Sequence, residues 1–81
     1  MTFTVEIKDA DELPDGKAEV EVFVDREALA DLQAQLSHLK SPGDHAHFMT
    51  PSWGGQELTE EPQRDGNTIL NHLRVTLVGE G

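Results

Sequence analysis

Apolar and polar residues alternate in two segments near the N-terminus, and this spacing predicts two β-strands. The first strand is expected over residues 3–7, with Thr4 and Glu6 on its polar face. The second is expected over residues 18–24, with valines on one face and glutamates on the other. Because the turn signal Pro14-Asp15-Gly16 lies between the two segments, we expect them to form an antiparallel hairpin.

Residues 26–39 repeat their apolar positions at the spacing of an amphipathic helix. Asp25 stands directly before this segment and is a favourable N-cap, while Ser41-Pro42-Gly43 is expected to end the helix. One apolar stripe runs along the helix and consists of Ala28, Leu29, Leu32, Leu36 and Leu39. We expect this stripe to pack on the inward-facing strand residues, namely Val20, Val22, Val24, Phe48 and Val75.

Three more strands are expected in the second half of the chain, over residues 45–49, 56–59 and 68–78, with a loop over residues 60–67. The last strand is the longest, and Asn71 interrupts its apolar face. The order β-β-α-β-β-β predicts a single α+β domain over residues 1–81, with one antiparallel sheet and one helix packed on one face. Because one helix cannot cover five strands, we expect part of the sheet to be open to solvent or to a partner.

Charge and composition exclude several classes of partner. Six lysines and arginines stand against sixteen aspartates and glutamates, which gives a net charge of −10 at pH 7. This charge argues against nucleic acid and anionic membranes as direct partners, because both bind cationic surfaces. The absence of cysteine excludes disulfides and thiolate metal sites. With no apparent signal peptide, membrane span or cofactor motif, we expect a cytoplasmic protein that needs no cofactor.

The histidines are candidates for metal binding. His45 and His47 share one face of a predicted strand, with Cβ atoms about 7 Å apart, so both side chains can lean toward one ion. Asp44, His38 or His72 would have to supply a third ligand. Because no third ligand is fixed by the spacing, we favour partly exposed strand histidines and keep a site of His45, His47 and His72 as an alternative.

A hydrolytic triad is the enzyme alternative. Ser52, either His47 or His72, and either Asp44 or Asp65 supply the residue types that such a triad needs. No nucleophile-elbow pattern surrounds Ser52, however, and 81 residues leave little volume for a substrate cavity. We therefore expect that the protein is not an enzyme.

Two short motifs need a structural explanation. In Trp53-Gly54-Gly55, consecutive glycines favour a tight connection. A single tryptophan in a small domain favours a core position, although tryptophan is also enriched at interfaces. In Asn71-His72, a polar pair interrupts an apolar strand, which predicts a buried hydrogen-bond network to the Trp-Gly-Gly turn or to the His45/His47 strand.

Three motifs occur in order along the chain, namely His45-x-His47, Trp53-Gly54-Gly55-x-x-Leu58-Thr59 and Asn71-His72-Leu73. With the alternating apolar strand that follows, they resemble the immunity protein 32 family of bacterial polymorphic toxin systems, most clearly over residues 44–77. The resemblance implies a cytoplasmic protein that binds a cognate toxin domain and neutralises it by occlusion. Such a protein needs a complementary surface and no catalytic residues.

We expect the partner-binding face to combine aromatic and acidic side chains, namely His45, His47, Trp53, Glu57, Glu60 and Glu61. The strong negative charge suits a toxin domain with a basic surface. Two alternatives from other classes stay open. One is a metal-binding domain built on the histidines, and the other is an accessory domain that homodimerises through its open sheet face or edge strands.

Overall fold

The computed structural model describes residues 1–8 and 19–79 and confirms a small α+β domain with one helix and five strands. The element order is β-β-α-β-β-β, as predicted, although the last two strands are not formed by the residues expected, and a short 3-10 helix follows the third strand. The elements are β1 (Phe3–Ile7), β2 (Val20–Val24), α1 (Arg26–Ser37), β3 (His45–Met49), η3 (Pro51–Trp53), β4 (Thr68–Ile69) and β5 (His72–Thr76). The predicted turn at residues 14–16 lies outside the described residues.

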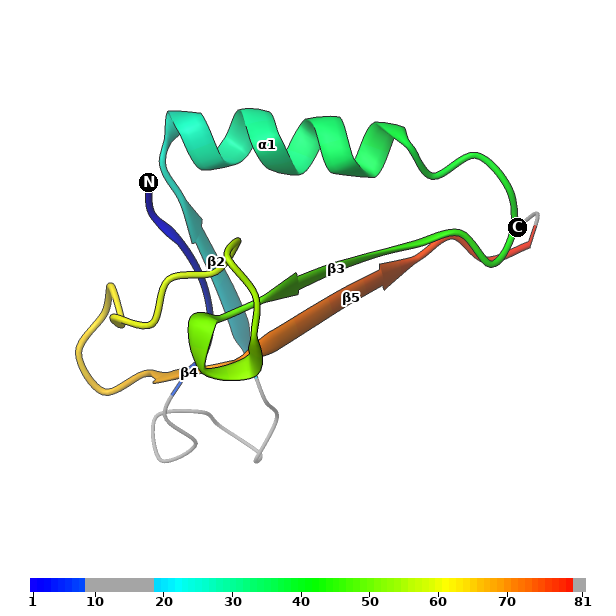
Figure 1. Ribbon diagram of the computed structural model, residues 1–81. Helices are drawn as coiled ribbons and strands as arrows, with labels where there is room; N and C mark the ends of the chain where they lie inside the picture. The colour runs from blue at the N-terminus through cyan, green and yellow to red at the C-terminus, as the bar shows by residue number, and fades with distance from the viewer. Residues whose placement is uncertain (9–18, 80–81) are drawn as a thin grey trace.

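The strands form two antiparallel sheets, where the sequence predicted one. One sheet has the order β2-β1-β4, and the other pairs β3 with β5. Figure 1 shows β3 and β5 as a long ribbon beneath α1, with the steeply inclined β2 at its left. The predicted strand over residues 68–78 is divided between the sheets, because the Leu70 N–H still bonds to the Val5 carbonyl of β1 whereas His72 already pairs with Met49 of β3.

The predicted strand over residues 56–59 is wrong. Leu58 N–H donates to the Met49 carbonyl at 3.1 Å, and Thr59 N–H donates to the Phe3 carbonyl at 2.7 Å. A segment that bonds once to each of two different strands cannot form a ladder with either strand. Instead, residues 58–59 join the β3–β5 sheet to β1, and the buried side chain of Leu58 lies in the core between them.

The helix begins where the sequence predicts. Asp25 caps it, with one carboxylate oxygen accepting a hydrogen bond from Ala28 N–H at 2.8 Å, and the helix ends at Ser37 rather than at Leu39. Only part of the predicted apolar stripe faces the core. Ala28 is fully buried and Leu32 and Leu39 are partly buried, but two other leucines of the stripe, Leu29 and Leu36, are exposed.

The expected packing of α1 on the valines of β2 is only partly present. Val24 packs against the core, whereas Val20 is 56% exposed and Val22 is 48% exposed. The helix starts directly after Val24 and runs away from β2 above the β3–β5 ribbon, so it reaches only the last valine of the strand (Figure 1). The core therefore gathers around two tilted aromatic rings, Phe3 and Phe48, whose centroids are 5.4 Å apart.

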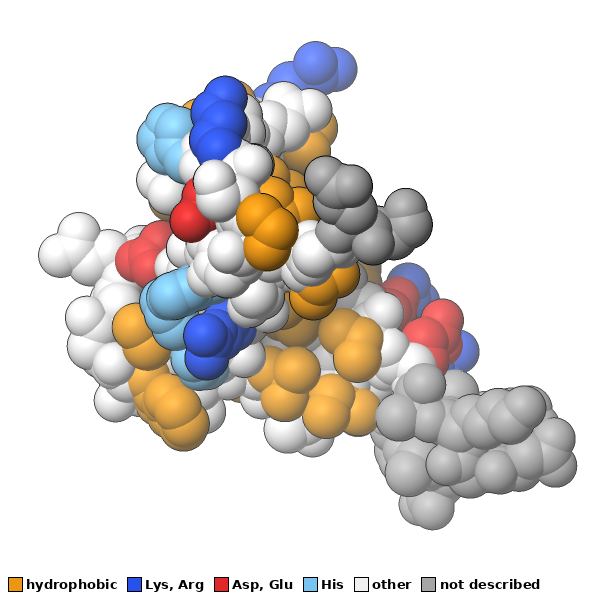
Figure 2. All heavy atoms as spheres, turned by 90° about the vertical axis from the view of Figure 1, so that its right-hand side faces the viewer, with side chains coloured by type: hydrophobic (Ala, Val, Ile, Leu, Met, Phe, Trp, Pro, Cys, Tyr) orange, Lys and Arg blue, Asp and Glu red, His pale blue; other side chains and the backbone are white. Residues whose placement is uncertain are grey.

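Because α1 covers only part of the strands, some apolar surface remains exposed. The radius of gyration is 14.0 Å, whereas a compact chain of this length is expected at about 12 Å. In Figure 2, hydrophobic side chains reach the surface across the face that looks to the right of Figure 1. Within residues 1–8 and 19–79, no helix is long and apolar enough to cross a membrane.

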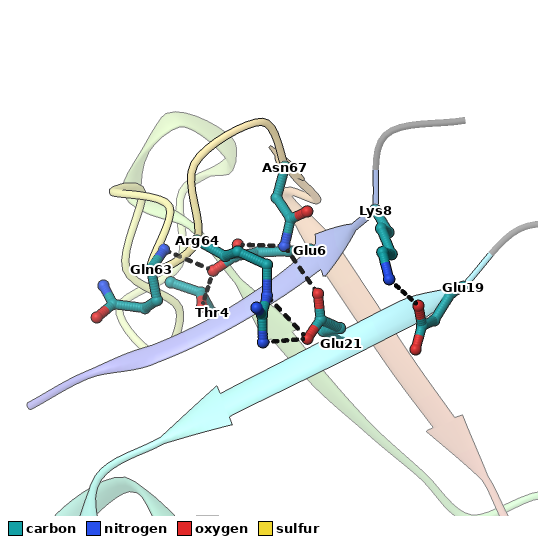
Figure 3. A network of polar contacts seen from close by, with 8 residues as sticks. All are labelled: Thr4, Glu6, Lys8, Glu19, Glu21, Gln63, Arg64 and Asn67. Carbon is teal, nitrogen blue, oxygen red and sulfur yellow. Dashed lines mark hydrogen bonds and ion pairs between the residues drawn. The ribbon is translucent and has the colours of Figure 1, made fainter. Parts of the chain in front are cut away.

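The polar face of β1 is buried, which corrects the prediction of a half-buried strand. Glu6 is fully buried, and its carboxylate accepts hydrogen bonds from Thr4 Oγ1 at 2.6 Å, Gln63 N–H at 2.8 Å and Asn67 Nδ2 at 2.9 Å. The Asn67 amide also donates to Glu21 of β2 at 3.1 Å. Figure 3 shows these side chains converging from two strands and from the 60–67 loop, which confirms the predicted loop and explains what covers β1.

Candidate protein-binding surface

The turn after β3 projects Trp53 into solvent. The Thr50 carbonyl accepts hydrogen bonds from both Trp53 N–H and Gly55 N–H, each at 2.9 Å, and these bonds close the turn. Trp53 is the last residue of η3 and is 58% exposed, so the interpretation of this tryptophan as a core residue is wrong. A large aromatic side chain is thus presented on a backbone that is itself held in place.

The two glycines of the motif have different roles. Gly54 has a φ of +85°, a left-handed conformation that side chains rarely adopt, and it caps the 3-10 helix. At Gly55, an added Cβ atom would lie 2.6 Å from the carbonyl carbon of Met49 and equally close to its Cβ atom. Because no real Cβ makes such contacts with backbone, Gly55 allows the turn to pack directly on β3.

The prediction that Asn71 has hydrogen-bond partners is confirmed, although Asn71 is only partly buried. Thr50 Oγ1 donates a hydrogen bond to Asn71 Oδ1 at 2.8 Å, and Thr50 N–H donates to the Asn71 carbonyl at 3.0 Å. Thr50 is fully buried, and its own carbonyl holds the Trp53 turn. The sequence analysis did not identify Thr50, because a single threonine before a proline carries no signal of such a role.

Three histidines and the tryptophan form a row of aromatic rings, which we call the aromatic row: His45, His47, His72 and Trp53. The centroids of His45 and His47 are 4.8 Å apart, those of His47 and His72 are 5.1 Å apart, and those of His72 and Trp53 are 6.1 Å apart. His47 and His72 are stacked, with His47 Nδ1 and His72 Nε2 at 2.8 Å. Figure 2 shows histidine side chains at the surface with hydrophobic side chains beside them.

The aromatic row favours neutral histidine at its centre. Desolvation lowers the pKa of His47, and the positive charges that His45, His72 and Arg74 can carry lower it further. The uncharged ring of His47 then stacks on His72, which in turn lies next to Trp53. A positive charge is therefore disfavoured on the central ring of the row.

The side chains of the metal and triad alternatives have other partners. Among residues 1–8 and 19–79, no group of three or more histidine, aspartate or glutamate side chains is placed to hold a metal ion. The facing nitrogens of His47 and His72 bond to each other. The carboxylate of Asp44 accepts hydrogen bonds from Lys40 N–H and Ser41 N–H, both at 3.0 Å, so it closes the loop before β3 instead of orienting a histidine.

Two of the acidic side chains predicted for the binding face accept backbone hydrogen bonds, and one of them, Glu60, holds the Trp53 turn. Glu60 Oε1 accepts a hydrogen bond from Ser52 N–H at 2.9 Å, and hydrogen bonds from Ser52 lower the pKa of Glu60. Glu57 Oε2 accepts a hydrogen bond from Gln56 N–H at 2.7 Å. Glu61 is exposed. The negative charge around Trp53 is therefore partly fixed in position by the backbone.

Comparison with known protein families, with curated proteins and with solved structures finds no match for this chain. The resemblance in its motifs to immunity proteins thus stays a prediction. The three motifs meet in space, because the His47 ring stacks on His72 and the His72 ring lies beside Trp53.

Proposed function

We propose that this protein is a binding module that neutralises a toxin domain by covering part of its surface, with Trp53 as the central contact. The observation that carries the proposal is the 58% exposure of Trp53 on a turn fixed by hydrogen bonds. Tryptophan is the residue most often found at the energetic centre of protein interfaces. Exposure of this large apolar side chain to water is unfavourable in free energy, and burial against a partner would remove that unfavourable contribution.

The rigidity of the turn supports this role. Binding is weakened by the entropy lost when flexible groups become ordered. Trp53 lies on a backbone already fixed by the Thr50 carbonyl, by Gly55 against Met49 and by the Glu60 carboxylate. Little further ordering is needed when a partner covers it.

The toxin-neutralising role is supported by the motif resemblance and by charge. A net charge of −10 steers basic surfaces toward the protein, and nucleases and other enzymes that act on polyanions commonly carry such surfaces. Occlusion requires an exposed contact surface and no catalytic residues. The aromatic row with its flanking glutamates provides a surface of this kind.

The proposal predicts a toxin gene beside the gene for this chain, and the test uses the C-terminal domain of that toxin. Co-expression of this protein should restore growth to cells that produce the toxin domain, and calorimetry should give one-to-one binding. Trp53→Ala should weaken binding by about 30-fold or more, the loss that defines an interface hot spot. Because Trp53 is the only tryptophan of the chain, its fluorescence should shift to shorter wavelength when a tryptophan-free toxin variant binds.

Leu29→Ala is the matched control, because it removes an exposed apolar side chain from α1, away from the Trp53 turn. It should bind as tightly as the natural protein. Both variants should keep the melting temperature of the natural protein within a few degrees. Unchanged binding of Trp53→Ala would reject Trp53 as the central contact, and the absence of any complex or protection would reject the toxin-neutralising role.

A further inference from the structure

Two cavities open between α1 and β3, one on either side of Gln35. The first has a volume of about 360 Å³, and the second has a volume of about 460 Å³. Asp31, Gln35 and His38 lie at positions i, i+4 and i+7 of the helix region, so they share one face over about 10 Å of its length. Both volumes lie in the range of ligand-binding pockets.

The first cavity is lined by apolar and acidic side chains. Phe3 and Phe48 belong to the core behind it and are each only 2% exposed, whereas Met1, which also lines it, is 50% exposed and supplies apolar surface. Asp31 comes from the helix and Glu57 from the segment after the Trp53 turn, so the two carboxylates reach the cavity from different elements. No lysine or arginine among the described residues lines this cavity or forms an ion pair with either carboxylate.

We propose that the cavity lined by Phe3, Phe48, Asp31 and Glu57 binds an arginine side chain presented by a partner protein. An arginine has an apolar stem of methylene groups that packs along apolar side chains such as Met1 and a planar cation that pairs with carboxylates. The N-terminal ammonium group of Met1 is the one cation among the described residues that line the cavity, and it lies 3.9 Å from the carboxylate of Asp25. The net charge of −10 favours a basic occupant.

Arginine fits the cavity better than lysine does for two reasons. Its guanidinium group carries five donors in a plane, so it offers donors for the carboxylates and for the amide oxygens of Gln35 and Gln56, which also line the cavity. It is also more weakly hydrated than an ammonium group, so it loses less hydration energy on entering a partly apolar pocket.

This inference goes beyond the proposed function, because it concerns a pocket separate from Trp53 and names the side chain that occupies it. It therefore needs a test without the toxin domain. The probe is N-acetyl-arginine methylamide, titrated into the ¹⁵N-labelled full chain and followed by amide chemical shifts. The corresponding citrulline compound has the same shape without the charge and serves as the matched ligand control.

We expect saturable shifts for the arginine probe, centred on the backbone amides of Asp31, Gln35, Gln56 and Glu57, and none for the citrulline probe. The double variant Asp31→Asn, Glu57→Gln should weaken binding about tenfold, as expected for two partly exposed ion pairs. Both substitutions keep the size of the side chain, and a glutamine at position 57 can still accept the hydrogen bond from Gln56 N–H.

Glu27→Gln is the matched protein control, because it removes one negative charge from an exposed side chain of α1 that does not line the cavity. This variant should bind the arginine probe as the natural protein does. Shifts that are linear and spread over the acidic surface would overturn the proposal, as would equal binding by the citrulline compound or by N-acetyl-lysine methylamide. Shifts confined to the amides around Trp53 would also overturn it, even if the toxin-binding role of Trp53 is correct.

Discussion

The buried carboxylate of Glu6 offers the sharpest test of how this fold is stabilised. It links β1 to the 60–67 loop, across 57 residues of sequence to Gln63 and 61 residues to Asn67. Glu6→Ala removes the shared acceptor and leaves Thr4 Oγ1 and the Gln63 N–H without the only hydrogen-bond partner that each has among the described residues. Asn67 keeps its second bond, to Glu21.

The expected loss of stability follows from these contacts. A buried donor left without a partner lowers the free energy of unfolding by about 1–3 kcal/mol. Because Gln63 is exposed, water can partly replace its lost partner, so we expect the two donors together to cost about 3 kcal/mol. The whole free energy of unfolding for a chain of this length is about 4–12 kcal/mol. Glu6→Gln keeps the volume and one acceptor oxygen, and its cost should be about half that of Glu6→Ala.

Urea unfolding followed by far-ultraviolet circular dichroism measures both variants. With a slope of about 1 kcal/mol per molar urea, Glu6→Gln should lower the midpoint by about 1.5 M, and Glu6→Ala by about twice as much. Glu19→Gln is the control, because Glu19 pairs with Lys8 at 3.3 Å on the surface, and it should change the stability by less than about 0.5 kcal/mol. A Glu6→Ala midpoint within the range of this control would refute the argument.

The dependence of stability on pH gives an independent check that the charged form of Glu6 stabilises the fold. Burial raises the pKa of Glu6, but the hydrogen bonds from Thr4, Gln63 and Asn67 together outweigh burial and lower it below its ordinary value near 4.5. A carboxylate whose pKa is lower in the folded state stabilises the fold fully at pH values above its unfolded-state pKa. This stabilisation is lost as the pH falls through the folded-state pKa. The stability difference between the natural protein and Glu6→Gln should therefore be constant above about pH 5.5 and shrink below pH 4.5.

Two further predictions concern the candidate binding surface. Gly55→Ala should prevent stable folding, because its Cβ would overlap the backbone of Met49. Gly54→Ala meets open space and should lower the free energy of unfolding by only about 1 kcal/mol through conformational strain. Equal melting temperatures for the two variants would contradict this difference. His47 should titrate below 6.5 in NMR experiments, and His45→Gln should raise the pKa of His47 by removing a neighbouring positive charge; an unchanged value would mean that His45 does not help to lower it.

Local signals in the sequence predicted the elements that depend on local physics. Alternation predicted β1, β2 and β3, and the helical spacing after Asp25 predicted both α1 and its N-cap. The polar interruption at Asn71 correctly predicted a hydrogen-bond network, because a buried amide needs partners. In each case a few neighbouring residues determine the outcome.

The features that the sequence did not predict depend on contacts between distant segments. Glu6 has the spacing of a solvent-facing residue, and only the 60–67 loop makes it a buried one. Asn71 interrupts the apolar pattern of residues 68–78 where the partner strand changes, but this interruption does not reveal that the chain passes there from β1 of one sheet to β3 of the other. The exposure of Trp53 likewise depends on how the turn packs on Met49, which no nearby residue reveals.

The Trp-Gly-Gly turn also relates the two surfaces proposed for binding. Trp53 ends the aromatic row, while Gln56 and Glu57, three and four residues later, line the arginine pocket. Even a fully extended chain covers only about 14 Å over four residues, and a typical interface covers about 800 Å² on each partner. One partner that buries Trp53 is therefore large enough to reach the pocket. Because Gly55 packs on Met49 and the Leu58 N–H bonds to the Met49 carbonyl, the segment between the two surfaces is held at both ends. The two contacts are thus positioned relative to each other before any partner binds, which reduces the entropy cost of engaging both.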